Sequence, residues 1–407
     1  MNVTYIILLI ISLDFAFNTW LNRRNNKAAK QEIPDLLKGL YDEEEYRKSN
    51  AYQEDKYNIQ KITSLLSFIV TFVFIALGGI AFLDRIIAQL ELHGILSSLL
   101  YFGALGLASY VIHLPFSYYK IFRIESKYGF NTMSRGLFWM DQIKGTLLFI
   151  LVGGGLLSGI IWIYFNLTEE FWWVAWICIS LFSLIMTFTY SSFIVPLFNK
   201  QSPLEKGPLL DAIHLLAGKL GFELNQIYVI DGSKRSTKAN AYFTGFGAKK
   251  RIVLFDTLIQ DLDQDEILAV LAHEIGHYKK KHVIINLINS ILLTGFTLWV
   301  LNFVLQSSEL MESLGVESPN FHVGLLVFVF IYQPISEFTG IIMNYLSRQF
   351  EYQADDYAKT HTKAEDLIEA LKKLNRKSLS NVTPDKYYEF VHYSHPNIER
   401  RIKALMS

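Results

Sequence analysis

Residues 264–282 read QDEILAVLAHEIGHYKKKH and contain an HExxH sequence from His273 to His277. The apolar residues ahead of it repeat with the spacing of a helix. Because residues four apart lie on one face of a helix, both imidazoles can bind one zinc ion. Glu274 lies beside the first ligand, where its carboxylate can take a proton from the attacking water. The stretch therefore predicts the catalytic centre of a zinc hydrolase.

A site of this kind needs a third protein ligand, and a second segment offers a candidate. Residues 344–356 read NYLSRQFEYQADD, in which Glu351 and Asp355 are one helical turn apart. Glu351 can complete a His–His–Glu site, and Asp355 can accept a hydrogen bond from the outer nitrogen of a ligating histidine. The alternative is an ordinary charged helix surface.

The composition indicates a membrane protein with a water-exposed part. The chain has 407 residues, of which 51% are hydrophobic and 19% are charged, whereas soluble domains have about 25% charged residues. The formal net charge of zero gives no support for a nucleic-acid partner. The single cysteine, Cys178, excludes an intrachain disulfide and a cysteine-based zinc cluster. Any metal site must therefore use histidine and carboxylate ligands.

Seven stretches are long and apolar enough to cross a bilayer, which takes about 20 residues per helix. We predict spans at 3–21, 63–83, 96–118, 146–165, 171–195, 283–306 and 322–346. The first stretch has no basic region ahead of it and no small-residue cleavage site, and Arg23 and Arg24 follow it. We therefore interpret it as a retained anchor and not as a signal peptide.

The lysine and arginine residues orient these spans. Nine lie between the first and second spans and five between the third and fourth. The loop between the second and third spans contains only Arg85, and the loops 166–170 and 307–321 contain none. Because basic residues favour the cytoplasmic side, we expect the N-terminus outside or in the lumen and the C-terminus in the cytoplasm. Both a bacterial inner membrane and an endoplasmic reticulum membrane are compatible with this topology.

This topology divides the chain into four parts. They are a membrane region with five spans at 1–196, a polar part at 197–282, spans six and seven at 283–346, and a second polar part at 347–407. The two polar parts lie on the same side of the membrane, and we expect them to form one zinc protease domain. The shared side also favours the ligand interpretation of Glu351.

Two strands are expected in the first polar part, at 226–232 and 250–256, where β-branched residues are bounded by turn signals. Between them lie Asn240 and Ala241. An extended peptide can bind by adding to an exposed strand edge, and the small side chain of Ala241 would leave room for it. A simple turn is an equally good interpretation of this segment.

Residues 394–402 read SHPNIERRI and offer two further candidates. His395 can donate a hydrogen bond to the oxyanion of a tetrahedral intermediate, and Arg401 can brace the metal-binding residues. Taken alone, a surface His-Pro turn ahead of an amphipathic helix explains the segment better.

Taken together, these features resemble the integral-membrane zinc peptidases of the gluzincin kind, and in particular the type I CAAX prenyl endopeptidases. The resemblance covers nearly the whole chain. Besides the zinc motif and the seven spans, the matching residues are 114–119, 124–125, 128–131, 141–144, 196–199, 240–242, 347–348, 351, 354–355, 395–396 and 401. Together these matches are specific, whereas the zinc motif alone would not be.

The resemblance implies a mainly α-helical integral membrane protein. Its seven transmembrane helices would form a barrel around a water-filled chamber, capped on the cytoplasmic side by an α+β zincin-type metalloprotease domain. Its substrate would be a C-terminally prenylated CAAX-type peptide, from which the terminal tripeptide is released.

The resemblance also implies roles for individual residues. One zinc ion per chain would be held by His273, His277 and Glu351, with Glu274 as general base and acid. The substrate edge would be formed by Asn240 and Ala241, with assistance at the oxyanion from His395.

Other functions stay compatible with the residues themselves. A membrane quality-control peptidase of the HtpX type would apply the same zinc chemistry to misfolded membrane proteins. A transporter or channel would use polar residues inside its spans, such as His113 and Glu337, as a solute path and would need no stoichiometric metal. An intramembrane protease is disfavoured because charged residues flank the zinc motif. The sequence does not address the oligomeric state.

Overall fold

The computed structural model describes residues 3–39, 41–222, 224, 226–244, 251–316 and 320–407. Within these residues, seven helical segments are long and apolar enough to cross a membrane. They are Val3–Ala28, Glu43–Ala76, Gly94–Glu125, Arg135–Asn166, Phe171–Phe198, His282–Leu305 and Phe321–His361. Five predicted spans lie within these segments, and the sixth exceeds its segment only by Gln306, whereas the second runs past the end of its helix at Ala76.

The second predicted span, 63–83, contains a break that hydropathy does not reveal. Helix α2 (Glu43–Ala76) ends just before Gly78, whose φ of +74° is left-handed and stops a helix. A separate helix, α3 (Gly79–Ala88), follows. At its other end α2 begins far outside the apolar region, where the side chain of Asp42 caps the backbone N–H of Glu45.

Three spans are single unbroken α-helices, namely α1 (Val3–Ala28), α12 (His282–Leu305) and α14 (Phe321–His361). The other three spans are α-helices interrupted or ended by π-helical turns. Their parts are α4 (Gly94–Tyr119), η2 (Lys120–Glu125), α5 (Arg135–Leu148), η3 (Phe149–Gly154), α6 (Gly155–Asn166), α7 (Phe171–Thr189), η4 (Tyr190–Ile194) and α8 (Val195–Phe198).

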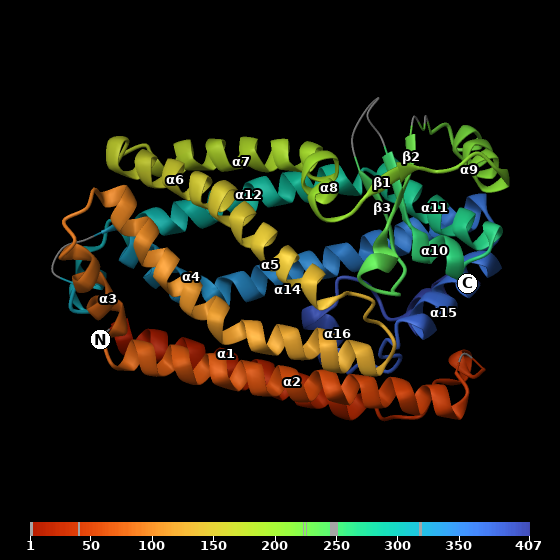
Figure 1. The fold of residues 1–407 in the computed structure, drawn as a ribbon, viewed down its shortest axis with the longest axis horizontal. Coiled ribbons are helices and arrows are strands. Elements are labelled where there is room, and N and C mark those ends of the chain that lie inside the picture. Colours follow the sequence, from red (N-terminus) through yellow and green to blue (C-terminus); the bar gives the residue numbers. More distant parts are fainter. Residues whose placement is uncertain (1–2, 40, 223, 225, 245–250, 317–319) are drawn as a thin grey trace.

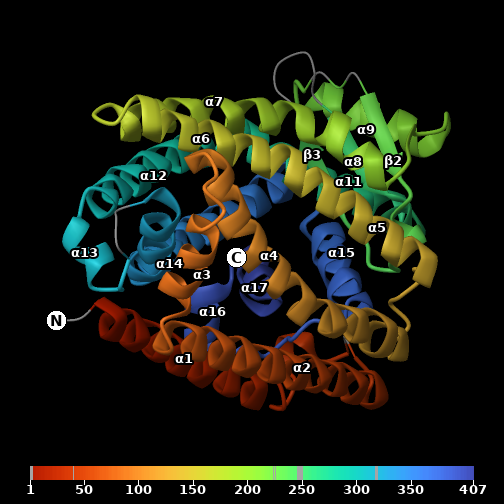
Figure 2. The same ribbon diagram turned by 60° about the vertical axis from the view of Figure 1, so that its left-hand side comes forward.

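The spanning helices are arranged as the staves of a barrel (Figure 2). In the most apolar window of each span, only 6–17% of the residues are buried. In a solid bundle the inner faces would be buried against one another, so this exposure indicates a wall one helix thick around a hollow interior. Two cavities border this wall. One, of about 810 Å³, lies at α1, α2 and α14, and the other, of about 800 Å³, lies at α2, α4 and η2.

A four-stranded sheet lies at the opposite end of the molecule from the N-terminus (Figure 1). Its strands are β1 (Gln201–Pro203), β2 (Gln226–Ile230), β3 (Ala241–Thr244) and β4 (Arg251–Phe255). The order is β1-β2-β4-β3, with β2 and β4 parallel and the outer pairs antiparallel. Both expected strands are thus present, although Lys250 lies outside the described residues and Asp256 already begins the next helix.

Helices from both polar parts of the chain pack around this sheet. They are α9 (Pro208–Lys219), α10 (Asp256–Asp261), α11 (Gln264–Lys279), α15 (Ala364–Lys377), α16 (Lys386–His392) and α17 (Ile398–Met406). Short helices at Asp35–Leu37 (η1), Gly232–Lys234 (η5) and Ser308–Glu312 (α13) complete the described elements. One hydrophobic core joins the sheet to α9, α10, α11, α15 and α17 and contains residues as distant in sequence as Ile252, Leu271 and Ile402.

A second hydrophobic core lies among the spans and includes Ile7, Tyr101 and Phe321. The polar residues at membrane depth have partners in neighbouring helices. Nε2 of His113 lies 2.9 Å from the hydroxyl of Ser67 on α2. The carboxylate of Glu337 accepts a hydrogen bond of 3.1 Å from the Asn18 amide on α1.

Helices α11 and α14 approach closely at Gly276. A Cβ atom at this position would lie 3.1 Å from Cβ of Tyr357 and 3.2 Å from both Cα and the carbonyl oxygen of Ala354. Two of these three atoms belong to the α14 backbone, which cannot move aside cheaply. A larger side chain would therefore push the two helices apart.

We predict that Gly276→Val lowers the free energy of unfolding by about 1–3 kcal/mol, as overpacking does in tightly packed sites. Thermal unfolding of the purified protein in detergent measures this loss. Gly218→Ala is the matched control, because this helical glycine on α9 has no atom within 4 Å of the added Cβ. Equal unfolding temperatures for Gly276→Val and the native chain would contradict the close packing.

Candidate metal centre

The centre is built where α14 leaves the barrel and packs against α11. Helix α11 begins with a capping box, in which Asp263 and Glu266 satisfy each other's backbone N–H groups. It presents His273 and His277 one turn apart. Helix α14 runs for 41 residues and carries Glu351 in a buried position near its end.

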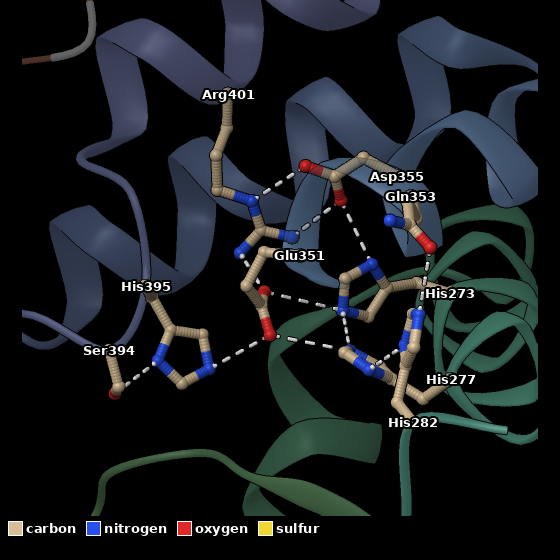
Figure 3. Close-up of polar contacts among 9 residues, drawn as sticks. All are labelled: His273, His277, His282, Glu351, Gln353, Asp355, Ser394, His395 and Arg401. Atoms are coloured by element: carbon tan, nitrogen blue, oxygen red, sulfur yellow. Dashed lines mark hydrogen bonds and ion pairs between the residues drawn. The ribbon is translucent and has the colours of Figure 1, made fainter. Parts of the chain in front are cut away.

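Three side chains meet as the sequence predicts (Figure 3). Nε2 of His273 lies 3.2 Å from Nε2 of His277. The two carboxylate oxygens of Glu351 complete a triangle, with Oε1 lying 3.3 Å from His277 Nε2 and Oε2 lying 3.6 Å from His273 Nε2.

This triangle fits a tetrahedral metal ion. Bonds of about 2.0–2.1 Å at tetrahedral angles place neighbouring ligand atoms about 3.3 Å apart. The two imidazole nitrogens are 3.2 Å apart, and His277 Nε2 lies 3.3 Å from Oε1 of Glu351, so both distances are close to this value. Oε2 of Glu351 is buried without a hydrogen-bond partner among the described residues, as expected for an atom that is a metal ligand. Two imidazoles and one carboxylate are ligands that zinc commonly takes in catalytic sites.

Asp355 and Arg401 surround the ligands. Oδ1 of Asp355 lies 2.9 Å from Nδ1 of His273, the nitrogen that faces away from the other ligands. Arg401 on α17 donates two hydrogen bonds to Asp355, of 2.8 and 2.6 Å, and its third nitrogen lies 3.4 Å from Glu351. Burial disfavours the guanidinium charge, but the two carboxylates outweigh this and raise the pKa of Arg401.

His282 and Gln353 form a second support that the sequence interpretation missed. Nδ1 of His277 lies 3.0 Å from Nδ1 of His282, and Nε2 of His282 lies 3.1 Å from the carbonyl oxygen of Gln353. With Nε2 of His277 facing the metal position, its Nδ1–H donates to His282, which in turn donates to Gln353. The spacing of His277 and His282 was a signal for their contact, whereas nothing local in the sequence points to Gln353.

Glu274 lines a cavity of about 340 Å³ that His273 and Glu351 also border. Burial raises the pKa of this carboxyl group, and the neighbouring His273 and His277 oppose the shift. The described residues form no hydrogen bond with its side chain, so its oxygens are free to bind water or substrate. This environment suits a group that accepts and returns a proton.

His395 lies on the opposite side of the cavity. Its Nε2 is 3.2 Å from Oε1 of Glu351, and its Nδ1 is 3.0 Å from the hydroxyl of Ser394. The side chain is 63% exposed, yet the cavity walls partly exclude water, and this desolvation lowers its pKa. The segment that sequence alone describes best as a surface turn therefore brings an imidazole to the centre.

Asn240 and Ala241 border the same cavity. Strand β3, which begins at Ala241, is the last strand of the described sheet and pairs only with β4. Its outer edge is therefore open to an added strand, as the peptide-binding interpretation requires. The backbone carbonyl of Asn240 accepts a hydrogen bond from Phe255, which holds the start of this edge in place.

Comparisons with known proteins agree with this architecture. Residues 22–200 match a family model described as the CAAX prenyl protease N-terminal region with five membrane helices, and residues 203–407 match peptidase family M48. A CAAX prenyl protease 1 homolog from Oryza sativa is 36% identical over 411 residues, covering 98% of this chain and 96% of that protein. The Homo sapiens homolog is 33% identical and covers 96% and 92%.

The crystal structure of S. mikatae Ste24p superposes with a TM-score of 0.95 at 33% identity and covers all of both chains. The similarity to these proteases extends over the whole chain and not only the metal centre, so it excludes the alternative that the chain is a transporter or channel. The chain belongs to peptidase family M48 and is a membrane metalloprotease of the CAAX prenyl protease 1 group.

Proposed function

We propose that this protein hydrolyses the peptide bond after the prenylated cysteine of CAAX-type substrates and releases the terminal tripeptide. The observation that carries the proposal is the cluster of His273, His277 and Glu351, of which His273 and Glu351 border the same cavity as the open edge of β3. Apolar residues of this cavity, including Val270, Leu367 and Leu371, suit the aliphatic side chains of such a tripeptide.

We propose zinc as the metal, held by His273, His277 and Glu351. When bound, zinc supplies a Lewis acid that polarises the scissile carbonyl and lowers the pKa of water towards about 7. Glu274 takes a proton from the attacking water and then delivers it to the leaving amine. His395 donates a hydrogen bond to the oxygen that becomes negative as the carbonyl is attacked.

The other residues position the reacting groups. Asn240 and Ala241 hold the peptide in an extended form along β3. Asp355 fixes the ring orientation of His273. The positive charge of Arg401 offsets the negative charges of the buried Glu351 and Asp355. We propose that 197–282 and 347–407 form one protease domain on the cytoplasmic side and that 1–196 and 283–346 form the membrane barrel.

A farnesylated peptide ending in a CAAX sequence tests the activity directly. The purified protein should cleave it after the modified cysteine, and mass spectrometry should find the tripeptide. An unmodified, unfolded membrane protein is the substrate of the rival quality-control peptidase. Cleavage of that protein alone, with the farnesylated peptide left intact, would favour the rival function.

We predict that Glu274→Gln lowers kcat by about 10²–10⁴-fold, because it removes the proton acceptor and keeps the shape of the side chain. Zinc content should stay near one per chain. Asp265→Asn, an exposed residue on the same helix, is the control and should keep its activity. Turnover of Glu274→Gln at the native rate would refute its role as base.

We predict that Glu351→Ala loses the metal and that Asp355→Asn lowers metal affinity by about 10–100-fold. Titration against a series of chelators, with zinc measured by plasma mass spectrometry, reports both effects without an activity assay. Asp356→Asn changes an exposed neighbour on the same helix and should leave affinity unchanged. Native zinc occupancy in Glu351→Ala would exclude this carboxylate as a ligand.

The proposed orientation predicts where new cysteines can be labelled. In a Cys178→Ser background, Glu169→Cys lies in the loop between α6 and α7, and Glu205→Cys lies between β1 and α9. A membrane-impermeant maleimide applied outside intact cells, or inside the lumen of sealed vesicles, should label only Glu169→Cys. Labelling of Glu205→Cys alone would reverse the topology.

A further inference from the structure

A second cavity, of about 390 Å³, adjoins the catalytic cavity. The two share several residues of their walls, among them Ser378, His395 and Pro396. The second cavity is also bordered by Lys56 of α2 and by Lys238, which lies just ahead of the substrate edge. No acidic residue is among the described residues that line it. The cavity therefore has a basic end close to the metal centre.

The two lysines differ in how their charges are compensated. The ammonium of Lys238 donates to Glu125 and to the hydroxyl of Tyr52, each at 2.8 Å. Tyr52 in turn donates to the other oxygen of Glu125 at 2.8 Å. Glu125 is the carboxylate that attracts Lys56 through space, but both of its oxygens already have donors.

Among the described residues, Lys56 has no such hydrogen-bonded carboxylate. Its ammonium lies 5.2 Å from the centre of the Tyr52 ring, and Lys238 lies 5.3 Å from the same centre. Within the described part of the chain Lys56 forms no hydrogen bond or ion pair. Two ammonium groups that share one ring and one carboxylate leave one positive charge for an anion.

The position of this charge along the substrate edge can be related to the length of a peptide. Lys238 borders the second cavity, whereas Asn240 and Ala241 border the catalytic cavity. Residues 238–241 therefore connect the two, and three residues reach at most about 10 Å. A peptide bound along this edge would have its scissile bond at the metal position. The three residues after that bond have the same reach of about 10 Å and would extend towards the two lysines.

We propose that Lys56, supported by Lys238, binds the free C-terminal carboxylate of the substrate. This inference rests on the proposed function, since only a substrate cut three residues from its end places a carboxylate there. Charge-assisted hydrogen bonds from an ammonium to a carboxylate recognise the end of a chain and not its side chains. Lys56 is therefore a residue for specificity, and the barrel helix α2 contributes it.

The experiment compares two farnesylated peptides that differ only in a C-terminal carboxylate or carboxamide. The native protein should cleave the carboxylate form with a kcat/KM about 10-fold higher than that of the carboxamide form, because the carboxamide cannot form the ion pair. The difference should lie in KM. Lys56→Met should lower kcat/KM for the carboxylate form about 10-fold and that for the carboxamide form much less. The ratio between the peptides should therefore approach one.

Two further variants separate a local charge effect from damage to the fold. Lys56→Arg keeps the charge and should keep most of the preference for the carboxylate. Lys48→Met removes an exposed lysine of the same helix that does not border the cavity, and it should leave the ratio unchanged. A native ratio in Lys56→Met, or a native protein that treats both peptides equally, overturns the proposal.

Binding of the product tripeptide distinguishes this proposal from the proposed function. Calorimetry with Val-Ile-Met, as free acid and as amide, measures carboxylate recognition without any cleavage. If the native protein cleaves neither farnesylated peptide, the proposed function fails, and the tripeptide titration still decides the role of Lys56. Tighter binding of the acid that disappears in Lys56→Met supports the role, and equal binding of acid and amide refutes it.

Discussion

The contact between α11 and α14 is the constraint on which the metal centre and the barrel both depend. Helix α11 brings two imidazoles, and α14 brings the carboxylate that completes the triangle. Gly276 allows the two backbones to approach closely enough for this. Because α14 is one continuous helix from the far side of the barrel to Glu351, a displacement of its membrane part also moves a ligand. The position of the metal site is therefore set by the packing of the membrane helices.

The charges around this contact explain why the C-terminal segment is needed. Glu351 and Asp355 are both buried, and two buried carboxylates one turn apart repel each other unless a positive charge is near. Arg401 supplies such a charge from α17 and donates two hydrogen bonds to Asp355. The last helix of the chain thus supports a centre whose ligands come from α11 and α14.

The sequence predicts much of this architecture because its signals are local. Hydropathy locates the spans, and the spacing of His273 and His277 predicts a shared helix face. Hydropathy does not show that Gly78 ends a helix inside the second predicted span. The His282–Gln353 pair and the place of His395 depend on how distant segments pack, which no local pattern contains.

The wall of the barrel also contributes to the chemistry of the cut. Lys56 comes from α2, whereas the metal ligands come from α11 and α14, so the two ends of a bound tripeptide would contact different parts of the fold. The network of Glu125, Tyr52 and Lys238 connects α2 to η2 and to the segment ahead of β3 through hydrogen bonds of 2.8 Å. Because the carboxylate site and the metal site are a fixed distance apart, the bond that is cut is the one at that distance from the C-terminus of the substrate. Substrates with different side chains in the tripeptide can then be cut at the same position.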